Sequence, residues 1–446
     1  MKKNEFVLVT ILNGIISVIF TLLSSPGIFF SDSYARVTLS EHIIECWSFA
    51  GCAERVGHTI TFLPSFFMAI SKYFTEGYSF FTFVCAFLYL TFSFCLIKKI
   101  NAPYPLLQYL FFILNPVLLF VCVWNAPSVL CYTFVAALII LLTKNFYWYD
   151  ICILFFCCVF IFGSHESSLL LLPLILCIII FGKNLSKIQK IFSCFAVVLS
   201  LVFIFVFPLM YQVEKIPIYS GGFAWEMLDM TQNLSQKERE RYFYDIADEK
   251  SLNTALERIR QDENSLNSYY WDNRNDLSAY NIGKNKSSGR IIKQYLKLAK
   301  DKPEIFIYTK SKFIKRTLGI TKPLMVCFYE DSKDIQKAEV FFDNSEATKI
   351  LCKIFNNAAN GSLIRYPWLV FLISLCMLLI EIYRKSFDDK LYMLIFSFAV
   401  CMYGTFVITT HAFEIRYFLP SFCLLYIMDV AIACSWLKNF QIKNKK

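Results

Sequence analysis

The chain has 446 residues, of which 57% are hydrophobic and 18% aromatic, and its formal net charge is +10. Soluble domains average about 45–50% apolar residues, so this composition excludes a protein that folds entirely in water. Charged residues gather at segment ends and in one block at 212–362, which predicts a membrane body with one aqueous segment. The charges of this block nearly balance, which argues against a nucleic-acid partner.

The first predicted element is the apolar run at 5–24, which follows Met-Lys-Lys-Asn and has no small-residue cleavage site. We therefore expect an uncleaved first membrane helix and not a signal peptide. Further segments are apolar and about 20 residues long, the length that a spanning helix needs. They lie at 77–97, 103–123, 126–143, 147–163, 167–183, 188–211, 364–383, 389–409 and 416–437.

These segments predict an all-α fold: a polytopic transmembrane helical bundle of about ten spans with a large, mostly helical periplasmic segment. Residues 1–211 form an N-terminal membrane part that includes a first outer loop at 25–76. Residues 212–362 form the soluble segment, and residues 363–446 return to the membrane with the last spans.

Clusters of basic residues next to the predicted spans all fall on the same side. They are Lys2-Lys3, Lys98-Lys99, Lys144, Lys183, Lys187, Lys190, Arg384-Lys385, Lys443, Lys445 and Lys446. Because such loops stay in the cytoplasm, both termini are predicted to be cytoplasmic, in a bacterial inner (plasma) membrane. Residues 25–76 and 212–362 are then periplasmic. The apolar stretch 57–74 is predicted to lie on the outer membrane surface, since a span there would invert the later clusters.

The soluble segment carries helix signals of its own. Ser235 and Glu238 have capping-box spacing, and 289–300 reads as a second amphipathic helix. The stretch 304–316 alternates apolar and basic residues, which predicts a basic helix on the membrane surface. The polar stretch 262–288 is predicted to be a loop or a flexible lid.

Seventeen cysteines are present, and most lie inside apolar runs, where they behave as small hydrophobes. Neither a CxxC pair nor a Cys/His cluster has metal-ligand spacing, so no metal and no other cofactor is predicted. Cys46 and Cys52 fall in the first outer loop, and the sequence leaves open whether they form a disulfide.

Polar residues next to the first span form a first candidate site. Asp32 follows Pro-Gly in the outer loop, where it serves either as a helix N-cap or as a general base that takes the proton of a sugar hydroxyl. Arg36 is a candidate for binding a phosphate or sugar, and Tyr34 and His58 are acceptor-side candidates.

Two further outer turns contain ionisable residues. His165 and Glu166 lie between two spans, and form either a solvated loop or a site for a phosphate or sugar hydroxyl. Arg416 begins the last span, where its guanidinium either snorkels to the headgroups or makes a bidentate contact with a lipid-linked phosphate. His411 lies beside it as a further donor-side candidate, and Glu414 as an acceptor-side candidate.

Taken together, these motifs resemble the GT-C superfamily of integral-membrane glycosyltransferases, most closely the serotype-converting O-antigen glucosyltransferases. The residues that carry the resemblance are Pro26, Gly27, Asp32, Ser33, His58, Pro64, Lys302, Pro303, Tyr308, Arg416, Tyr417 and Pro420. The resemblance implies that Asp32 is the general base, that Arg416 contacts a phosphate, and that the donor is a polyprenyl-phosphate sugar. Between the third and fourth predicted spans, relatives often carry an acidic residue. This chain has Asn125-Ala126-Pro127 there instead.

The sequence thus predicts a membrane glycosyltransferase that moves a hexose, with inversion, from a polyprenyl-phosphate to a lipopolysaccharide O-antigen or another surface glycan. Its expected partners are the lipid donor, the glycan acceptor, the bilayer, a flippase and a donor-lipid synthase. An O-antigen polymerase is the first alternative, and a non-enzymatic polysaccharide flippase or transporter is the second.

Overall fold

The protein is known from a computed structural model, which describes residues 3–24, 31–48, 56–58, 61–75, 78–120, 127–215, 219–261, 277–278, 281, 288–326, 346–384, 389–409 and 413–443. It is an all-α protein, and six helices of the described part are long and apolar enough to cross a membrane. These helices cover Asn4–Leu23, Ser79–Ile100, Lys187–Tyr211, Pro367–Arg384, Lys390–Val407 and Ile415–Ile442.

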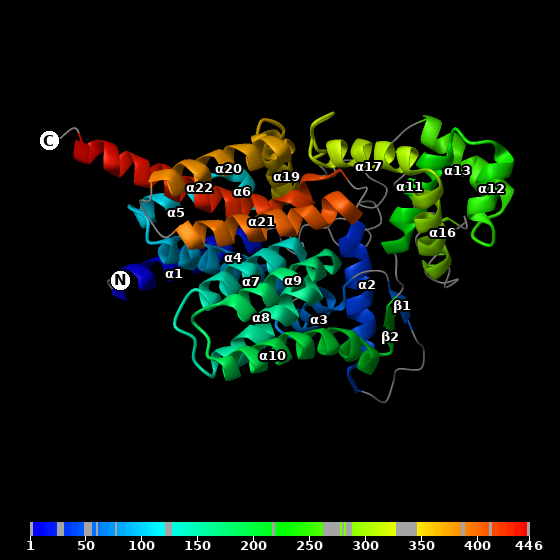
Figure 1. The fold of residues 1–446 in the computed structure, drawn as a ribbon. Helices are drawn as coiled ribbons and strands as arrows, with labels where there is room; N and C mark the ends of the chain where they lie inside the picture. Colours follow the sequence, from blue (N-terminus) through cyan, green and yellow to red (C-terminus); the bar gives the residue numbers. More distant parts are fainter. Residues whose placement is uncertain are drawn as a thin grey trace.

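The apolar helices run alongside one another as a bundle (Figure 1). Their bounds are α1 (Lys3–Leu23), α4 (Ser79–Ile100), α5 (Pro105–Leu114), α6 (Pro116–Phe120), α7 (Pro127–Leu142), α8 (Asp150–Ser164), α9 (Leu172–Phe181), α10 (Lys187–Val206), α20 (Pro367–Arg384), α21 (Asp389–Thr409) and α22 (Ile415–Lys443). Short 3-10 helices are η1 (Cys46–Ser48), η3 (Glu166–Leu171), η4 (Phe207–Tyr211) and η5 (Leu363–Arg365). Each predicted span coincides with one helix or a pair of short helices. The count of ten stays a prediction, because α5 to α9 are shorter than the others.

The predicted span at 103–123 is broken into α5 and α6 at Asn115-Pro116. Proline has no backbone N–H to continue the helix, so the chain can turn there. The Asn115 Oδ1 accepts hydrogen bonds from the backbone N–H of Val117 (3.0 Å) and Leu118 (3.4 Å), which caps α6. The break therefore follows from local side-chain chemistry.

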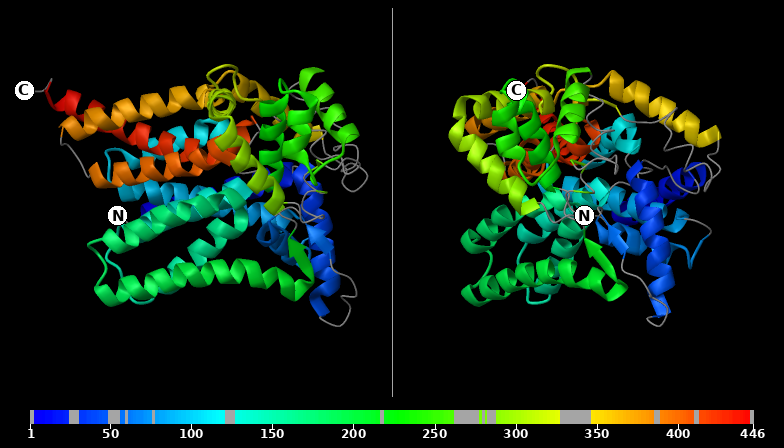
Figure 2. Two further views of the ribbon diagram at one scale, coloured as in Figure 1. Left: turned by 45° about the vertical axis from the view of Figure 1, so that its right-hand side comes forward. Right: turned by 90° about the vertical axis from the view of Figure 1, so that its right-hand side faces the viewer.

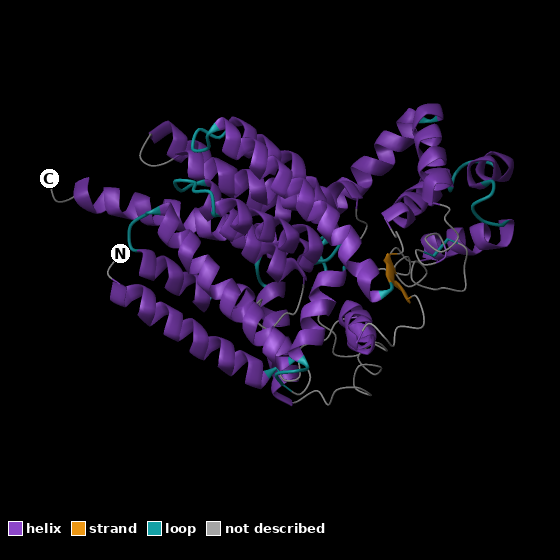
Figure 3. Cartoon of the chain, turned by 90° about the horizontal axis from the view of Figure 1, so that it is seen from below, coloured by secondary structure: helices purple, strands orange, loops and turns teal. Residues whose placement is uncertain are grey.

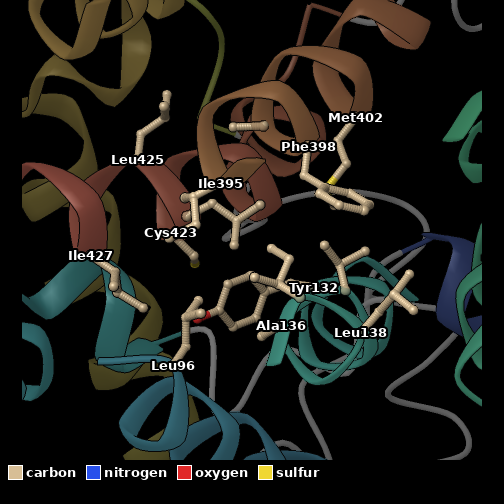
Figure 4. Packing of buried hydrophobic residues seen from close by; sticks show 14 of the residues in the cluster. Leu96, Tyr132, Ala136, Leu138, Ile395, Phe398, Met402, Cys423, Leu425 and Ile427 are labelled. Carbon is tan, nitrogen blue, oxygen red and sulfur yellow. The ribbon is translucent and has the colours of Figure 1, made fainter. Parts of the chain in front are cut away.

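The core of the bundle lies where α4, α7, α21 and α22 meet. Figure 4 shows Tyr132 and Ala136 of α7 facing Ile395 of α21 and Cys423 of α22. The Tyr132 hydroxyl is 2.9 Å from the hydroxyl of Ser93 on α4. Helices in a bilayer associate through close packing and hydrogen bonds between helices, and this core contains both.

One end of the bundle holds both chain termini (Figures 1 and 2). Lys98 Nζ at the end of α4 is 2.8 Å from Glu5 Oε2 of α1, and Lys99 Nζ donates to the Thr143 carbonyl after α7. Gln189 at the start of α10 donates to the Phe146 carbonyl. The predicted basic clusters at 98–99, 144 and 187–190 thus lie at one end, and which compartment this end faces stays a prediction.

The opposite end, called the distal end below, carries α2 (Ser31–Glu45) and the helices of the predicted soluble segment (Figure 1). Strand β1 (Val56–His58) pairs in parallel with β2 (Val213–Lys215), and within the described residues this pair is the only sheet (Figure 3). The pairing joins the first predicted outer loop to the start of the soluble segment. Both segments therefore belong to the same end of the bundle.

The segment 57–74, which the sequence predicts to lie on the outer membrane surface, contains helix α3 (Phe62–Ser71). Its ten residues rise about 15 Å, about half the thickness of a bilayer core, so α3 alone is too short to span. It is buried against α2 and α8, and a Cβ added to Gly163 would lie only 3.0 Å from Leu63 Cδ2. The helix packs against α2 and α8, and its position at the outer membrane surface stays a prediction.

The segment predicted to be soluble, called the soluble segment below, folds around its own apolar core. Its helices are α11 (Tyr219–Thr231), α12 (Gln236–Phe243), α13 (Glu249–Gln261), α16 (Ser288–Asp301) and α17 (Pro303–Thr317). The capping box is confirmed, since Ser235 and Glu238 each accept a hydrogen bond from the other's backbone N–H. Helix α19 (Glu346–Asn360) follows and contacts α6 and η5. Most of the predicted loop 262–288 lies outside the described residues.

The basic residues of α17 hold it against α11. Lys310 Nζ is 2.6 Å from Glu226 Oε1, and Lys312 Nζ is 3.1 Å from Asp229 Oδ1. The Tyr295 hydroxyl of α16 also donates to Glu226, and burial, followed by the Glu226 charge, raises the pKa of Tyr295. These two lysines therefore face α11, where the sequence predicted a basic face for the membrane surface.

Replacing Lys310 with Met is expected to lower the free energy of unfolding by about 3–5 kcal/mol, because the buried Glu226 carboxylate loses its counter-charge. Lys310 is 18% and Glu226 1% exposed, whereas in the neighbouring pair Lys312 is 40% and Asp229 8% exposed. The matched variant Lys312→Met should therefore cost less, because the lysine it removes is more exposed and Asp229 keeps a hydrogen bond from Gln232. Thermal unfolding of the purified variants checks this, and equal losses would contradict it.

A glycine turn connects α17 to the last membrane helices. Gly319 has φ +73°, and an added Cβ would lie 2.7 Å from the Arg365 carbonyl oxygen. The turn is closed by hydrogen bonds from the Gly319 N–H to the Arg316 carbonyl and from the Ile320 N–H to the Lys315 carbonyl. The Trp368 N–H at the start of α20 then bonds to the Leu318 carbonyl. This turn sets how the soluble segment joins the bundle.

The Gly319→Ala variant is expected to unfold at a lower temperature than the parent protein. The left-handed conformation costs a non-glycine residue about 1–2 kcal/mol, and the Arg365 carbonyl must also move. Gly404 in α21 has no atom within 4 Å of an added Cβ, so Gly404→Ala is the control and should be neutral or stabilising. An unchanged unfolding midpoint for Gly319→Ala would contradict the role of the turn.

Candidate functional site

The candidate site is built around Arg416, in the first turn of α22 at the distal end. Its Nε lies 2.5 Å from Glu414 Oε2, and its Nη2 donates to the Tyr417 hydroxyl at 2.9 Å. The side chains are largely buried, with 16% of Arg416 and 5% of Glu414 exposed. The guanidinium is therefore held in a fixed orientation by a carboxylate and a phenol.

His165 joins this cluster from the end of α8. Its ring stands edge-on to Phe406 of α21 at 5.1 Å and to Tyr417 of α22 at 6.2 Å between ring centroids. The Ser168 N–H and hydroxyl both donate to the His165 carbonyl, which fixes the turn that positions the ring. His165 from one predicted turn is thus brought beside Tyr417, the chain neighbour of Arg416 in the other predicted turn.

The backbone around Glu414 is anchored by the chain that follows α17. Met325 and Glu414 form a parallel bridge, in which the Met325 N–H bonds to the Phe413 carbonyl at 2.7 Å. The Ile415 N–H returns a bond to the Met325 carbonyl at 3.0 Å. Arg365 in turn binds the Leu324 carbonyl through its Nε at 2.9 Å. The soluble segment therefore contributes directly to the geometry of the site.

A second arginine lies next to the site, and sequence analysis did not identify it as a functional candidate. The Arg316 guanidinium carbon is 4.9 Å from the Phe413 ring centroid, and Nη1 donates to the Lys322 and Pro323 carbonyls. Arg316 was seen only as part of the basic stretch of α17. Its position beside Phe413 depends on the turn at Gly319, which the sequence does not reveal.

The remaining candidates of the first loop lie on α2 and β1. Asp32 and Tyr34 are in the first turns of α2, and His58 ends β1, but their side chains lie outside the described residues. Arg36 is buried on α2, a helix that packs against α3. Val37 of α2 packs beside residues of α4. The structure thus places these candidates at the distal end without testing their roles.

Two donor-side candidates are not described at the level of their side chains. Glu166 begins η3 directly after His165, but its side chain lies outside the described residues, as does all of His411. Cys46 is disulfide-bonded, whereas Cys52 lies outside the described residues. Within the described part of the chain, no three His, Cys, Asp or Glu residues are grouped to hold a metal ion, and independence of metals stays a prediction.

The Arg416 cluster combines a guanidinium with a carboxylate, a phenol and an imidazole, and Glu414 balances the charge of Arg416. A guanidinium offers paired N–H donors that match phosphate oxygens, and partial burial strengthens its charge interactions. The imidazole of His165 lies beside Tyr417 and adds a ring nitrogen donor and acceptor to the cluster. No family model, no curated protein and no solved structure matches the chain, so function has to be inferred from these residues and their placement.

Proposed function

We propose that the protein is a membrane glycosyltransferase that uses a polyprenyl-phosphate sugar at the distal end of its bundle, in the periplasm. The observation that carries the proposal is the meeting of His165, Glu414, Arg416 and Tyr417 at that end. Both termini and the basic clusters lie at the other end, which the positive-inside rule assigns to the cytoplasm.

The donor class follows from where the cluster lies. Nucleotide sugars and ATP are cytoplasmic, so a sugar transferred on the outer face has to arrive on a lipid carrier. The phosphate of such a carrier stays at the headgroup level, and in the proposal it meets Arg416 in the first turn of α22 there. Glu414 and Tyr417 orient the guanidinium before the donor binds, which lowers the entropy cost of binding.

Transfer with inversion needs a base on the face of the sugar opposite the departing phosphate. Asp32 has this role in the proposal, since a carboxylate at the start of α2 can take the proton of the attacking hydroxyl. The new glycosidic bond forms as the bond from C1 to the phosphate oxygen breaks. The proton of the acceptor passes to Asp32, and the electron pair leaves with the phosphate that Arg416 holds.

Glycan analysis of a strain that lacks this protein separates the three candidate functions. A transferase predicts that side-branch sugars disappear from a surface glycan of normal length. A polymerase predicts short chains, and a flippase predicts loss of the whole glycan. Restoration of the side branch by the wild-type gene would support the proposal, and short chains or complete loss would overturn it.

A further inference from the structure

An open hollow of about 420 Å³ lies on the distal end, beside the helix that carries Asp32. Its wall is formed by Glu41, Ile44 and Glu45 of α2, with Lys72 and Tyr73 from the turn after α3. None of these residues belongs to the Arg416 cluster. The hollow is therefore a separate feature, whose chemistry can be considered by itself.

The charges around the hollow disfavour an anion. Lys72 Nζ is 3.2 Å from Glu41 Oε1 and also lies over the ring of Tyr78, so its charge is matched within the protein. Burial alone would lower the pKa of Lys72, but Tyr78 and Glu41 together raise it, so the amine stays charged. Glu45 adds a second, exposed carboxylate, which leaves the hollow negative and rich in hydrogen-bond acceptors.

One aromatic ring, that of Tyr73, lines the same hollow, and the ring of Trp47 lies against it. Tyr73 is 61% exposed, and its ring lies 5.7 Å from that of Trp47, which is 37% exposed. Phe66 stacks behind Trp47 at 5.7 Å, so the indole is held in place. A sugar ring has C–H groups on its faces and hydroxyls around its edge. Exposed aromatic faces beside carboxylates provide partners for both.

Membrane contact is the competing explanation for exposed Trp and Tyr rings, because both are enriched at lipid headgroups. Membrane contact would account for the exposed rings but not for the carboxylates beside them. With Glu41 paired to Lys72, the Glu45 carboxylate leaves the wall with a net negative charge that would repel phosphate headgroups. Sugar hydroxyls instead donate hydrogen bonds to carboxylates. The combination of Tyr73, Glu41 and Glu45 therefore favours a neutral glycan over a lipid.

The hollow also lies within the length of a short oligosaccharide from the proposed base, Asp32. Glu41 and Glu45 follow Asp32 on α2, so at about 1.5 Å per residue they lie roughly 14–20 Å along the helix from it. A short oligosaccharide spans this distance. A chain seated in the hollow would reach Asp32 with a sugar that lies several units away.

We propose that this hollow binds a neutral segment of the acceptor glycan, remote from the bond that is made. The inference rests on the proposed transferase function. It makes the hollow a second binding subsite at the distal end, which holds a neutral part of the acceptor glycan. Tyr73 and Trp47 provide the stacking surface, while Glu41 and Glu45 accept hydrogen bonds from hydroxyls.

The test uses the full-length protein in lipid nanodiscs and an array of immobilised oligosaccharides. The array carries neutral hexose and deoxyhexose oligosaccharides, with sialylated and phosphorylated ones as anionic counterparts. The wild-type protein should bind neutral oligosaccharides and not anionic ones. Tyr73→Ala and Glu45→Gln should each weaken binding by about tenfold or more. Tyr149, also 61% exposed but located at the start of α8, provides the matched control Tyr149→Ala, which should bind normally.

Absence of neutral glycan binding by the wild type, or equal binding by the Tyr73 and Tyr149 variants, would overturn the inference. A lower unfolding temperature of Tyr73→Ala in nanodiscs, with unchanged glycan binding, would identify the ring as a membrane anchor and also overturn it. Asp32→Asn separates the two proposals, because it should lose transfer and keep binding. If that variant transfers sugar normally while Tyr73→Ala loses binding, the transferase assignment fails and the glycan subsite stands.

Discussion

Replacing Asp32 with Asn is expected to slow sugar transfer by about 10²–10⁴-fold, because an amide cannot accept the proton of the attacking hydroxyl. The two side chains are nearly the same size, and Asp32 lies in the first turn of α2. A carboxylate there stabilises the helix by only about 0.3–1 kcal/mol, so folding should persist. The measurement is transfer of labelled glucose from polyprenyl-phosphate-glucose by the purified protein.

The control for this variant makes the same chemical change elsewhere. Asp245 is exposed and has φ 59°, a conformation that Asn adopts readily, so Asp245→Asn should fold and transfer normally. A folded Asp32→Asn protein with nearly normal transfer would rule out Asp32 as the base. If that variant unfolds, Asp32→Glu keeps the carboxylate and should retain measurable transfer.

Replacing Arg416 with Lys is expected to raise the KM for the lipid donor by about tenfold to a hundredfold. A lysine offers one point charge where the guanidinium offers a planar fork, so one hydrogen bond to a charged phosphate, worth about 1.5–3 kcal/mol, is lost. A lysine also cannot contact Glu414 and Tyr417 with the same geometry. Steady-state kinetics with varied donor and constant acceptor measures the effect.

Arg384 provides the matched control for Arg416. It ends α20 at the end of the bundle opposite the site, where its guanidinium lies 5.1 Å from the ring of Trp436. Arg384→Lys should therefore leave the donor KM unchanged. A fall in kcat for Arg416→Lys with an unchanged donor KM would contradict a role for Arg416 in donor binding.

Features that depend on neighbouring residues could be predicted from the sequence. The capping box at Ser235 acts within one helical turn and is found where expected. The positions of the apolar helices follow from composition alone. The placement of the basic clusters at one end follows from the alternation of spans and loops.

Features that depend on distant contacts could not be predicted. His165 and Tyr417 lie on different helices, and no periodicity in the sequence reports that their rings meet. Lys310 on α17 was expected to face the membrane surface. It instead pairs with Glu226, so this side of α17 faces α11. Helix α3 was expected at the outer surface because a span there would invert the later basic clusters, but its packing against α2 and α8 could not be foreseen. Tertiary packing decided each of these.

Polar contacts inside the last membrane helices were also missed. Ser374 of α20 donates to Asp429 of α22 at 2.6 Å, and Trp436 of α22 donates to Glu381 of α20 at 2.9 Å. The two carboxylates fall within apolar runs, where single acidic residues did not alter the hydropathy signal. From the first contact to the second, the residue numbers rise by the same amount on both helices, so α20 and α22 run parallel. The acidic side chains lie at the interface between these two helices.

The central claim is that a lipid-linked sugar is the donor, and one assay tests it directly. The purified protein in proteoliposomes is given an acceptor glycan with either polyprenyl-phosphate-glucose or a glucose nucleotide, each carrying the same label. The account predicts labelled glycan from the lipid donor alone, and loss of that signal in Asp32→Asn. Transfer from the nucleotide donor, or no transfer from any polyprenyl-phosphate hexose, would contradict it.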